Sequence, residues 1–407
     1  MKNIKKIFLI SSSCGLLFLF GCNKKTKQVE TNLKPEPKNT QIKINTPKND
    51  KAVFKRQNGH FVPIEEYDKL QSKKELITIF VHGTVLPYPS ATNTIKTLKG
   101  DKNSPIKHEN FWHKYINNLR FEGLYRFQPI QDLGLQKIDL ENKNKLTDYQ
   151  ECSQKIANVF LSVYKKNNKA YKNYIYYTFG WSGRLDKERR LESGMQFYDQ
   201  LVKVVKKIRK RNKDGLDPDV QIFAHSHGGN VALNLAAAEA KNRKNLKIKD
   251  LVLLGTPVQT ETKGLISSGV FSKVYSFYSK GDDVQIIDFV STQKHHSRRT
   301  FRKVGEQVEL PKKLVQVQVK CDKLKPRHSE LWITKTRANL MYRDRLSIAP
   351  YPVSFYVPDI INLIEKYFKN SNSLKVNIRK GEKNLKNITI KDFDDRNKKT
   401  YNLKMPF

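Results

Sequence analysis

Residues 220–242 most strongly constrain the fold of this chain, because they predict a strand, a sharp turn and a helix in direct succession. The apolar run Val220–Phe223 has the length of a short buried strand. The pair Gly228–Gly229 then permits a tight turn, and apolar residues at helical spacing occupy Val231–Ala237. Ser226 falls between strand and helix, so we expect its hydroxyl to project from the end of a sheet.

Small residues stand two positions either side of this serine, Ala224 before it and Gly228 after it. This spacing is typical of a nucleophile elbow, a strained turn that also directs backbone N–H groups at a developing oxyanion. In the alternative interpretation Ser226 is only the N-cap of the helix. The preceding strand and the paired glycines favour the elbow.

Further strands predict the other parts of such a site. Upstream, the apolar run Leu76–Val81 ends in His82-Gly83-Thr84, a glycine-containing turn whose N–H groups can face the same oxyanion. Downstream, Asp250–Leu254 predicts a second buried strand, closed by Gly255-Thr256-Pro257.

Two later strands predict where an acid and a histidine lie. Val274–Tyr278 is followed by Gly281-Asp282-Asp283, and the alternating run Leu314–Val319 is followed by Lys325-Pro326-Arg327-His328. The chain order is therefore serine, acid, histidine. This is the order found in alpha/beta hydrolases, and it differs from both common orders of the serine proteases.

With these motifs in that order, residues 75–368 resemble the alpha/beta-hydrolase superfamily and its lipase-like and esterase-like branch. The resemblance implies an α/β fold with a mostly parallel central sheet, helices on both faces and an inserted cap or lid segment. The chain departs from the usual motif at Ala224, where glycine is commoner, and in a long insertion at 86–150.

The residues define a set of catalytic roles. Ser226 is the candidate nucleophile, His328 the general base, and Asp282 the acid that orients the histidine, with Asp283 as an open alternative. Backbone N–H groups of His227, Gly83 and Thr84 are predicted to form the oxyanion hole. The reaction is acyl transfer to water, and we expect neither a metal nor an organic cofactor.

Several other residues are candidates for structural or pocket-lining roles and not for catalysis. His225 and His227 flank the serine and, like His82, are expected to support the turn, whereas His295 and His296 are expected to be solvated. Trp181, after the aromatic strand that includes Tyr174–Phe179, either lines the substrate pocket or packs beneath a loop. The aromatic-rich insertion 86–150 is either a lid or an ordinary capping subdomain.

The N-terminus predicts export and lipidation. Residues 1–21 combine a lysine-rich start with a short apolar core, as a signal peptide does, and Gly21-Cys22 resembles the end of a bacterial lipoprotein signal. Cys22 is then the lipidated residue on the extracytoplasmic side of a membrane. The alternative is an uncleaved anchor, but the apolar run is shorter than the about 20 residues that span a bilayer.

The remaining organisation follows from composition. Residues 22–60 are polar and proline-containing and predict a flexible tether, residues 61–370 predict the hydrolase domain, and residues 371–407 a C-terminal extension. Cys152 and Cys321 are the cysteines left for a disulfide, which the sequence does not decide.

The net charge of +38 raises the question of nucleic acid, but lysine is spread along the whole chain and no aromatic-interleaved basic motif occurs. We expect no nucleic-acid partner, and attraction to an anionic lipid surface instead. The expected substrate is an acyl ester or lipid, with thioester or peptide hydrolysis open because the same site supports them. A catalytically inactive binding lipoprotein is the alternative, and the oligomeric state stays open.

Overall fold

The computed structural model describes residues 54–57, 60–63, 74–84, 128–142, 146–167, 171–212, 215–286, 297–302, 310–332, 346–348, 351–381, 385–393 and 398–404. The predicted signal peptide, Cys22, most of the tether, the insertion up to residue 127, His295 and His296 lie outside these residues. The chain divides into two compact units, Met1–Lys69 and Leu70–Phe407.

The first unit contains a short antiparallel hairpin that the sequence analysis did not anticipate. Strand β1 (Phe54–Gln57) pairs with β2 (His60–Pro63), with Gln57 opposite His60. This register leaves a two-residue connection, and its sequence, Asn58-Gly59, is the one such turns favour. The hairpin spans residue 60, where the tether was predicted to end.

In the second unit the described residues form a ten-stranded sheet in the order β12-β11-β10-β9-β8-β7-β6-β3-β5-β4. Every neighbouring pair from β5 to β10 along that order is parallel, whereas β4, β11 and β12 pair antiparallel at the two edges. The strands are β3 (Glu75–Val81), β4 (Gly134–Lys137), β5 (Asn173–Gly180), β6 (Asp219–His225), β7 (Ile248–Leu254), β8 (Phe271–Tyr278), β9 (Leu314–Cys321), β10 (Ser373–Lys380), β11 (Leu385–Asp392) and β12 (Lys398–Lys404).

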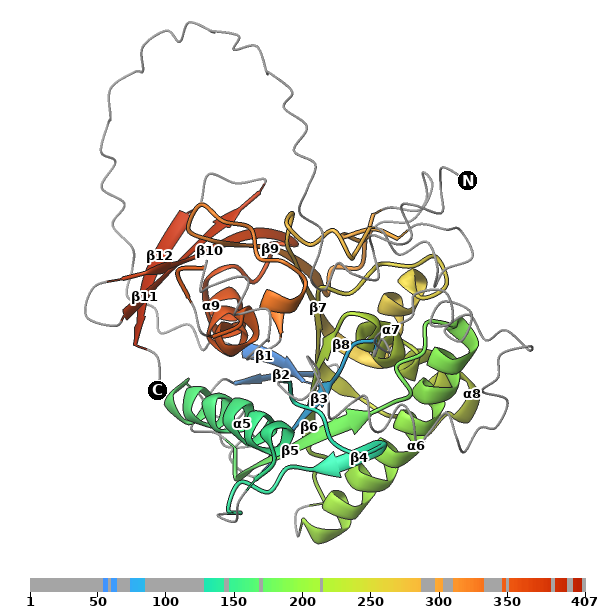
Figure 1. The fold of residues 1–407 in the computed structure, drawn as a ribbon. Coiled ribbons are helices and arrows are strands. Elements are labelled where there is room, and N and C mark those ends of the chain that lie inside the picture. The colour runs from blue at the N-terminus through green and yellow to red at the C-terminus, as the bar shows by residue number, and fades with distance from the viewer. Residues whose placement is uncertain are drawn as a thin grey trace, which may run out of the picture. The chain divides into compact units, whose positions relative to one another are not determined.

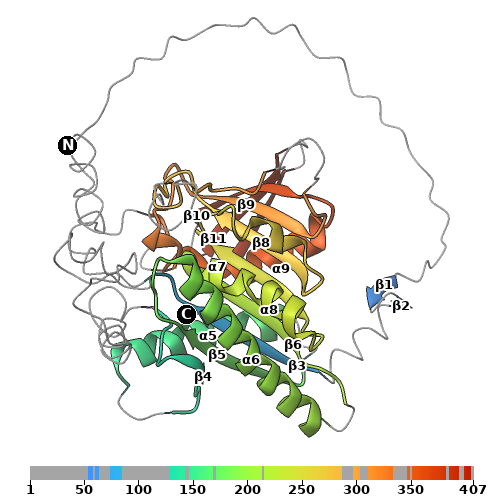
Figure 2. The same ribbon diagram turned by 90° about the vertical axis from the view of Figure 1, so that its right-hand side faces the viewer.

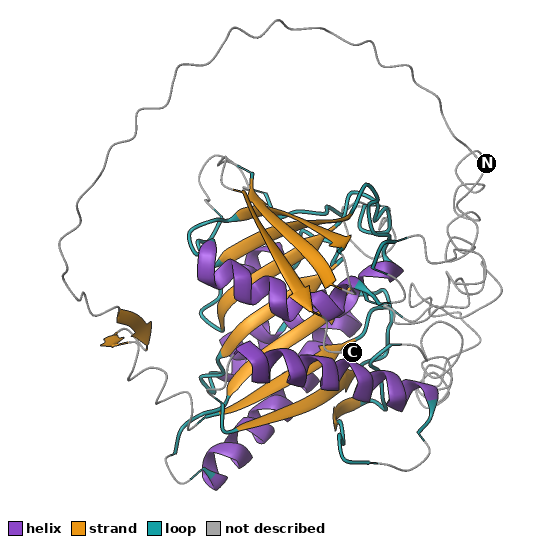
Figure 3. Cartoon of the chain, turned by 90° about the vertical axis from the view of Figure 1, so that its left-hand side faces the viewer, coloured by secondary structure: helices purple, strands orange, loops and turns teal. Residues whose placement is uncertain are grey.

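Helices cover both faces of this sheet (Figure 1). Helices α6 (Lys187–Arg211), α7 (His227–Leu233) and α8 (Leu235–Asn242) pack on one face, which Figure 2 turns toward the viewer. Helices α5 (Asp148–Asn167) and α9 (Val357–Tyr367) pack on the other, which Figure 3 shows. Short 3-10 turns η2 (Lys263–Ser267), η3 (Ser329–Leu331) and η5 (Val353–Tyr356) complete the described elements.

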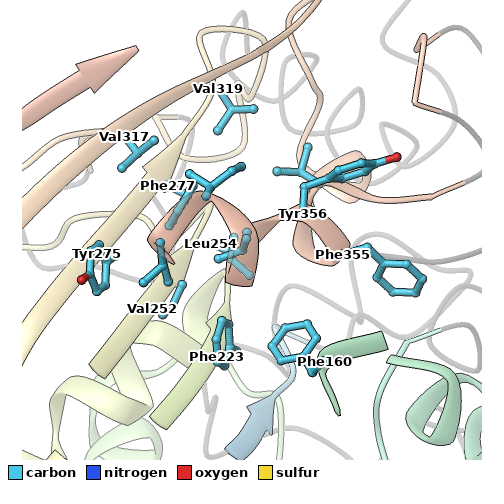
Figure 4. Close-up of a cluster of buried hydrophobic side chains, with 14 of the residues drawn as sticks. Phe160, Phe223, Val252, Leu254, Tyr275, Phe277, Val317, Val319, Phe355 and Tyr356 are labelled. Carbon is cyan, nitrogen blue, oxygen red and sulfur yellow. The ribbon is translucent and has the colours of Figure 1, made fainter. Parts of the chain in front are cut away.

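Two hydrophobic cores form because successive side chains of a strand point to opposite faces. On β3, Leu76 and Phe80 join the α5–α9 core, while Ile77 and Ile79 join the α6–α8 core. Figure 4 shows part of the first core, where aromatic residues of α5 and η5 meet side chains of the central strands. Burial on both faces explains why these strands are almost continuously apolar in sequence.

The strands predicted around residues 76–81, 174–179, 220–223, 250–254, 274–278 and 314–319 are confirmed, as is the helix from about residue 188 to 211. The end of the insertion adds the edge strand β4, and the described parts of 371–407 continue the same sheet as β10 to β12. Within the described part of the chain, no helix combines the length and apolar character needed to cross a bilayer.

The order of the strands switches at β3: the next long strand in the chain, β5, pairs on one side of it, and the following strand, β6, pairs on the other. In parallel α/β sheets, ligands bind outside the carboxyl ends of the strands at such a switch point. The turns after β3 and β6 are the ones that carry Gly83 and Ser226.

Candidate active site

Ser226 connects β6 directly to α7 in a strained backbone conformation. Its φ is 52° and its ψ is −132°, a region that residues with a side chain rarely adopt. Its side chain makes no capping hydrogen bond to α7, so the N-cap interpretation does not account for it. Its backbone N–H donates to the carbonyl of Leu254 on the neighbouring strand at 2.9 Å, which anchors the turn to the sheet.

Gly228 and Gly229, which follow the serine, are required because neighbouring segments of the chain approach them closely. A Cβ atom at Gly228 would lie 2.2 Å from the carbonyl oxygen of His82, and one at Gly229 would lie 2.0 Å from the hydroxyl of Thr256. Both distances are far below van der Waals contact. The first turn of α7 therefore packs directly on the ends of β3 and β7, as the elbow requires.

The turn His82–Thr84 lies against the serine. A Cβ at Gly83 would lie 2.8 Å from the Cβ of Ser226. The Nε2 atom of His82 accepts from the backbone N–H of Trp181 at 3.1 Å, so its Nδ1 atom carries the proton and donates to the Gly83 carbonyl at 2.7 Å. These bonds fix the turn that was predicted to supply oxyanion N–H groups from Gly83 and Thr84.

The side chain of Trp181 also binds this turn. Its indole Nε1–H donates to the carbonyl of His82 at 2.8 Å, and the two rings stack with their centroids 5.7 Å apart. The side chain is 2% exposed. Of the two interpretations of Trp181, packing beneath a loop describes its position, and the loop is the candidate oxyanion turn.

Asp282 and His328 are brought together from positions 46 residues apart in the chain. The carboxylate oxygen Oδ2 of Asp282 lies 2.8 Å from Nδ1 of His328, and Oδ1 accepts from the backbone N–H of Gln285 at 3.3 Å. Because a carboxylate accepts, the proton of the imidazole lies on Nδ1 and leaves Nε2 as the acceptor. Asp282 is fully buried, and the side chain of His328 is 19% exposed.

Asp283, the alternative acid, points elsewhere. Its carboxylate pairs with the guanidinium of Arg299 at 2.6 Å, and its side chain is 66% exposed. The same guanidinium donates from Nε to the backbone carbonyl of Asp282 at 2.9 Å. Arg299 therefore braces the turn, and the carboxylate that contacts His328 is that of Asp282.

Gly255 lies beneath the acid–histidine pair at the end of β7. Its φ is +61°, and a Cβ there would lie 2.9 Å from Oδ2 of Asp282 and 3.3 Å from Nδ1 of His328. The residue before it, Leu254, accepts the N–H of Ser226. The end of β7 thus touches both the serine turn and the pair, a role that sequence analysis did not assign. The available signal in the sequence was the glycine itself, directly after a buried strand, because glycine adopts a positive φ freely.

The histidines beside the serine are both buried. The ring of His225 contacts the rings of His328 and Trp332, with centroids 4.6 Å and 5.7 Å away. Nδ1 of His227 lies 3.4 Å from the amide nitrogen of Asn230 within the first turn of α7. Burial, followed by the neighbouring histidines His328, His82 and His227, holds the pKa of His225 well below its ordinary value.

These contacts place a hydroxyl, a histidine–carboxylate pair and a glycine turn at the carboxyl ends of adjacent parallel strands. Such an arrangement provides a nucleophile, a base in the correct tautomer and backbone donors, which together support acyl transfer. Within the described ranges, no group of three or more His, Cys, Asp or Glu side chains is arranged to hold a metal ion. Cys152 and Cys321 are not joined in a disulfide.

Comparison with known proteins adds no family to this description. No protein-family model and no curated protein matches the chain.

Proposed function

We propose that this protein is a serine hydrolase with an alpha/beta-hydrolase fold, esterase-like or lipase-like, that cleaves acyl esters through an acyl-enzyme. Ser226 attacks the carbonyl, His328 takes its proton and returns it to the leaving group, and Asp282 stabilises the imidazolium. The backbone N–H groups of His227, Gly83 and Thr84 bind the tetrahedral oxyanion. Each such donor lowers the barrier by about 3 kcal/mol.

One observation supports this proposal most strongly, namely the combination of a strained Ser226 with a buried Asp282–His328 pair at the ends of neighbouring strands. A serine with φ of 52° costs stability that a purely structural turn would avoid by using glycine. The buried carboxylate likewise costs desolvation unless it is partnered. The competing function, an inactive binding lipoprotein, gives no reason to keep both features.

Activity-based labelling tests the proposal. The purified protein should react with a fluorophosphonate, and mass spectrometry should find the adduct on Ser226. A chain-length series of nitrophenyl esters, assayed in parallel, should show hydrolysis and define the preferred acyl group. A folded protein with neither adduct nor hydrolysis would favour the inactive binding lipoprotein.

We further propose that the hydrolase is tethered to the extracytoplasmic side of a bacterial membrane through lipid on Cys22. The support is the sequence of the N-terminus, since Cys22 lies outside the described residues. Whether the insertion 86–150 is a lid or an ordinary capping subdomain stays a prediction, because the structure describes only its residues 128–142 and 146–150. The substrate would then be an ester at or near the membrane surface.

The lipidation proposal predicts a loss of membrane attachment. A bacterium that expresses the full chain and is fed labelled palmitate should yield a labelled, membrane-bound protein. Cys22→Ser should remove the label and release the protein from the membrane fraction. Label that persists in this variant would move the attachment to another cysteine, with Cys14 as the first to test.

Gly255 predicts a further effect on activity. In Gly255→Ala the new methyl group would press on the Asp282–His328 pair, and a misplacement of about 1 Å lowers turnover by about 100-fold. The positive φ adds about 1–3 kcal/mol of lost stability. Steady-state kinetics and thermal unfolding measure the two effects.

Gly264→Ala is the matched control for that measurement. Its Cβ would meet no atom within 4 Å, so both activity and stability should be retained. Wild-type turnover in Gly255→Ala would mean that close packing of Gly255 does not position Asp282 and His328.

A further inference from the structure

His225, the last residue of β6, occupies an unusual position because it touches the segment that carries the catalytic histidine. It lies next to Ser226 in the chain and is 5% exposed. Its ring stacks on Trp332, with an interplanar angle of 3°, and lies tilted by 38° against the ring of His328. Residues 326–332, which we call the histidine loop, are thus in contact with the strand that carries the nucleophile.

A hydrogen bond accompanies the ring contacts. Nε2 of His225 lies 3.2 Å from the backbone carbonyl oxygen of His328, which is 103 residues away in the chain. A carbonyl only accepts, so Nε2 carries the proton of the neutral ring. Burial keeps the pKa of His225 low, so the ring is neutral near neutral pH and has one proton, which lies on Nε2.

The histidine loop is therefore held at two points of the same residue. Asp282 fixes the side chain of His328 through Nδ1, and His225 fixes its backbone through the carbonyl oxygen. The carbonyl of His328 also accepts from the N–H of Leu331 at 3.4 Å within the loop, and the bond from His225 adds a link from the same carbonyl to the nucleophile strand. The two contacts together define where Nε2 of His328 lies relative to Ser226. The rate of proton transfer between these residues depends strongly on that position.

We propose that His225 is a positioning residue that holds the histidine loop on the nucleophile strand through its Nε2–H bond to His328. The inference rests on the proposed hydrolase function for its kinetic consequence, but the contact itself does not. A residue that only filled space would be replaced adequately by phenylalanine. A residue that acts through its donor would be replaced adequately by glutamine, whose amide nitrogen reaches the position of Nε2.

The test compares His225→Gln, His225→Phe and His225→Asn in the purified protein. Phe keeps a ring without a donor, and the amide of Asn is too short to reach the carbonyl. We expect kcat for a nitrophenyl ester to fall by roughly 10- to 100-fold in Phe and Asn, with KM within about twofold of wild type. In the Gln variant kcat should stay within about fivefold of wild type.

Amide hydrogen exchange provides a second measurement that does not depend on activity. Peptides that cover residues 326–332 should exchange faster in the Phe and Asn variants than in wild type and the Gln variant. Tyr198→Phe is a matched control, because it removes a hydroxyl bonded to Glu239 and to the N–H of Lys244 on the α6–α8 side. The control should change neither kcat nor exchange in the histidine loop.

The outcomes separate this inference from the proposed function. Wild-type kcat and wild-type exchange in the Phe and Asn variants would overturn the positioning role of His225. If Phe does not fold, the comparison of Asn with Gln decides the same question. If wild type hydrolyses no ester, the proposed function fails, while faster exchange of residues 326–332 in the Phe and Asn variants still supports the contact.

Discussion

Ser226→Ala is expected to abolish both fluorophosphonate labelling and ester hydrolysis, with a loss of turnover of up to about six orders of magnitude. The hydroxyl is the only group at this turn that can form the acyl-enzyme in the proposed reaction. Alanine carries the same backbone cost at a φ of 52°, so the fold should be retained. Labelling, steady-state kinetics and circular dichroism on the purified variant measure the three effects.

Ser267→Ala provides the comparison for this variant. Ser267 is exposed and ends η2, which precedes β8, at the opposite ends of the strands from the candidate site. Its replacement should leave labelling and turnover at wild-type levels. Retention of more than a few per cent of turnover in Ser226→Ala would require a different nucleophile.

Asp282→Asn is expected to lower turnover by about 10³- to 10⁴-fold with little change in substrate binding. An amide in place of the carboxylate donates to Nδ1 of His328 and so favours the tautomer in which Nε2 carries the proton. In that tautomer the histidine cannot accept the proton of Ser226. Steady-state kinetics should therefore show a lower kcat with KM nearly unchanged.

Asp283→Asn is the matched control, since it makes the same chemical change one residue away. It weakens an exposed ion pair with Arg299, which is worth at most about 1 kcal/mol, and Arg299 keeps its bond to the carbonyl of Asp282. Most activity should remain. The reverse order of severity in the two variants would assign the acid to Asp283.

The sequence alone predicted the central part of the fold. Strands such as β3, β6 and β7 are apolar on both faces, and this makes them recognisable without any knowledge of their neighbours. The turn at Ser226 was equally evident, because Gly228 and Gly229 admit the close approaches that it needs. Local composition was sufficient wherever the cause of the structure was local.

The edges of the sheet were less evident. Strands β10 and β11 alternate apolar with polar residues, with Leu374, Val376 and Ile378 in the first and Ile388 and Ile390 in the second, and the sequence analysis missed this strand pattern. Strand β12 is mostly polar, and β4 is only four residues long. Such segments become strands because an existing sheet offers them backbone partners, as β9 does for β10. The short β4 and the mostly polar β12 carry little of that information in their own sequence.

The tertiary structure alone decided which residues of the candidate site meet. The sequence left Asp282 and Asp283 adjacent and chemically identical, and only the path of the turn after β8 directs one to His328 and the other to Arg299. The bond between His225 and His328 joins residues 103 positions apart. Sequence patterns report periodicity and turn chemistry, whereas the pairing of distant side chains depends on how the strands are ordered in the sheet.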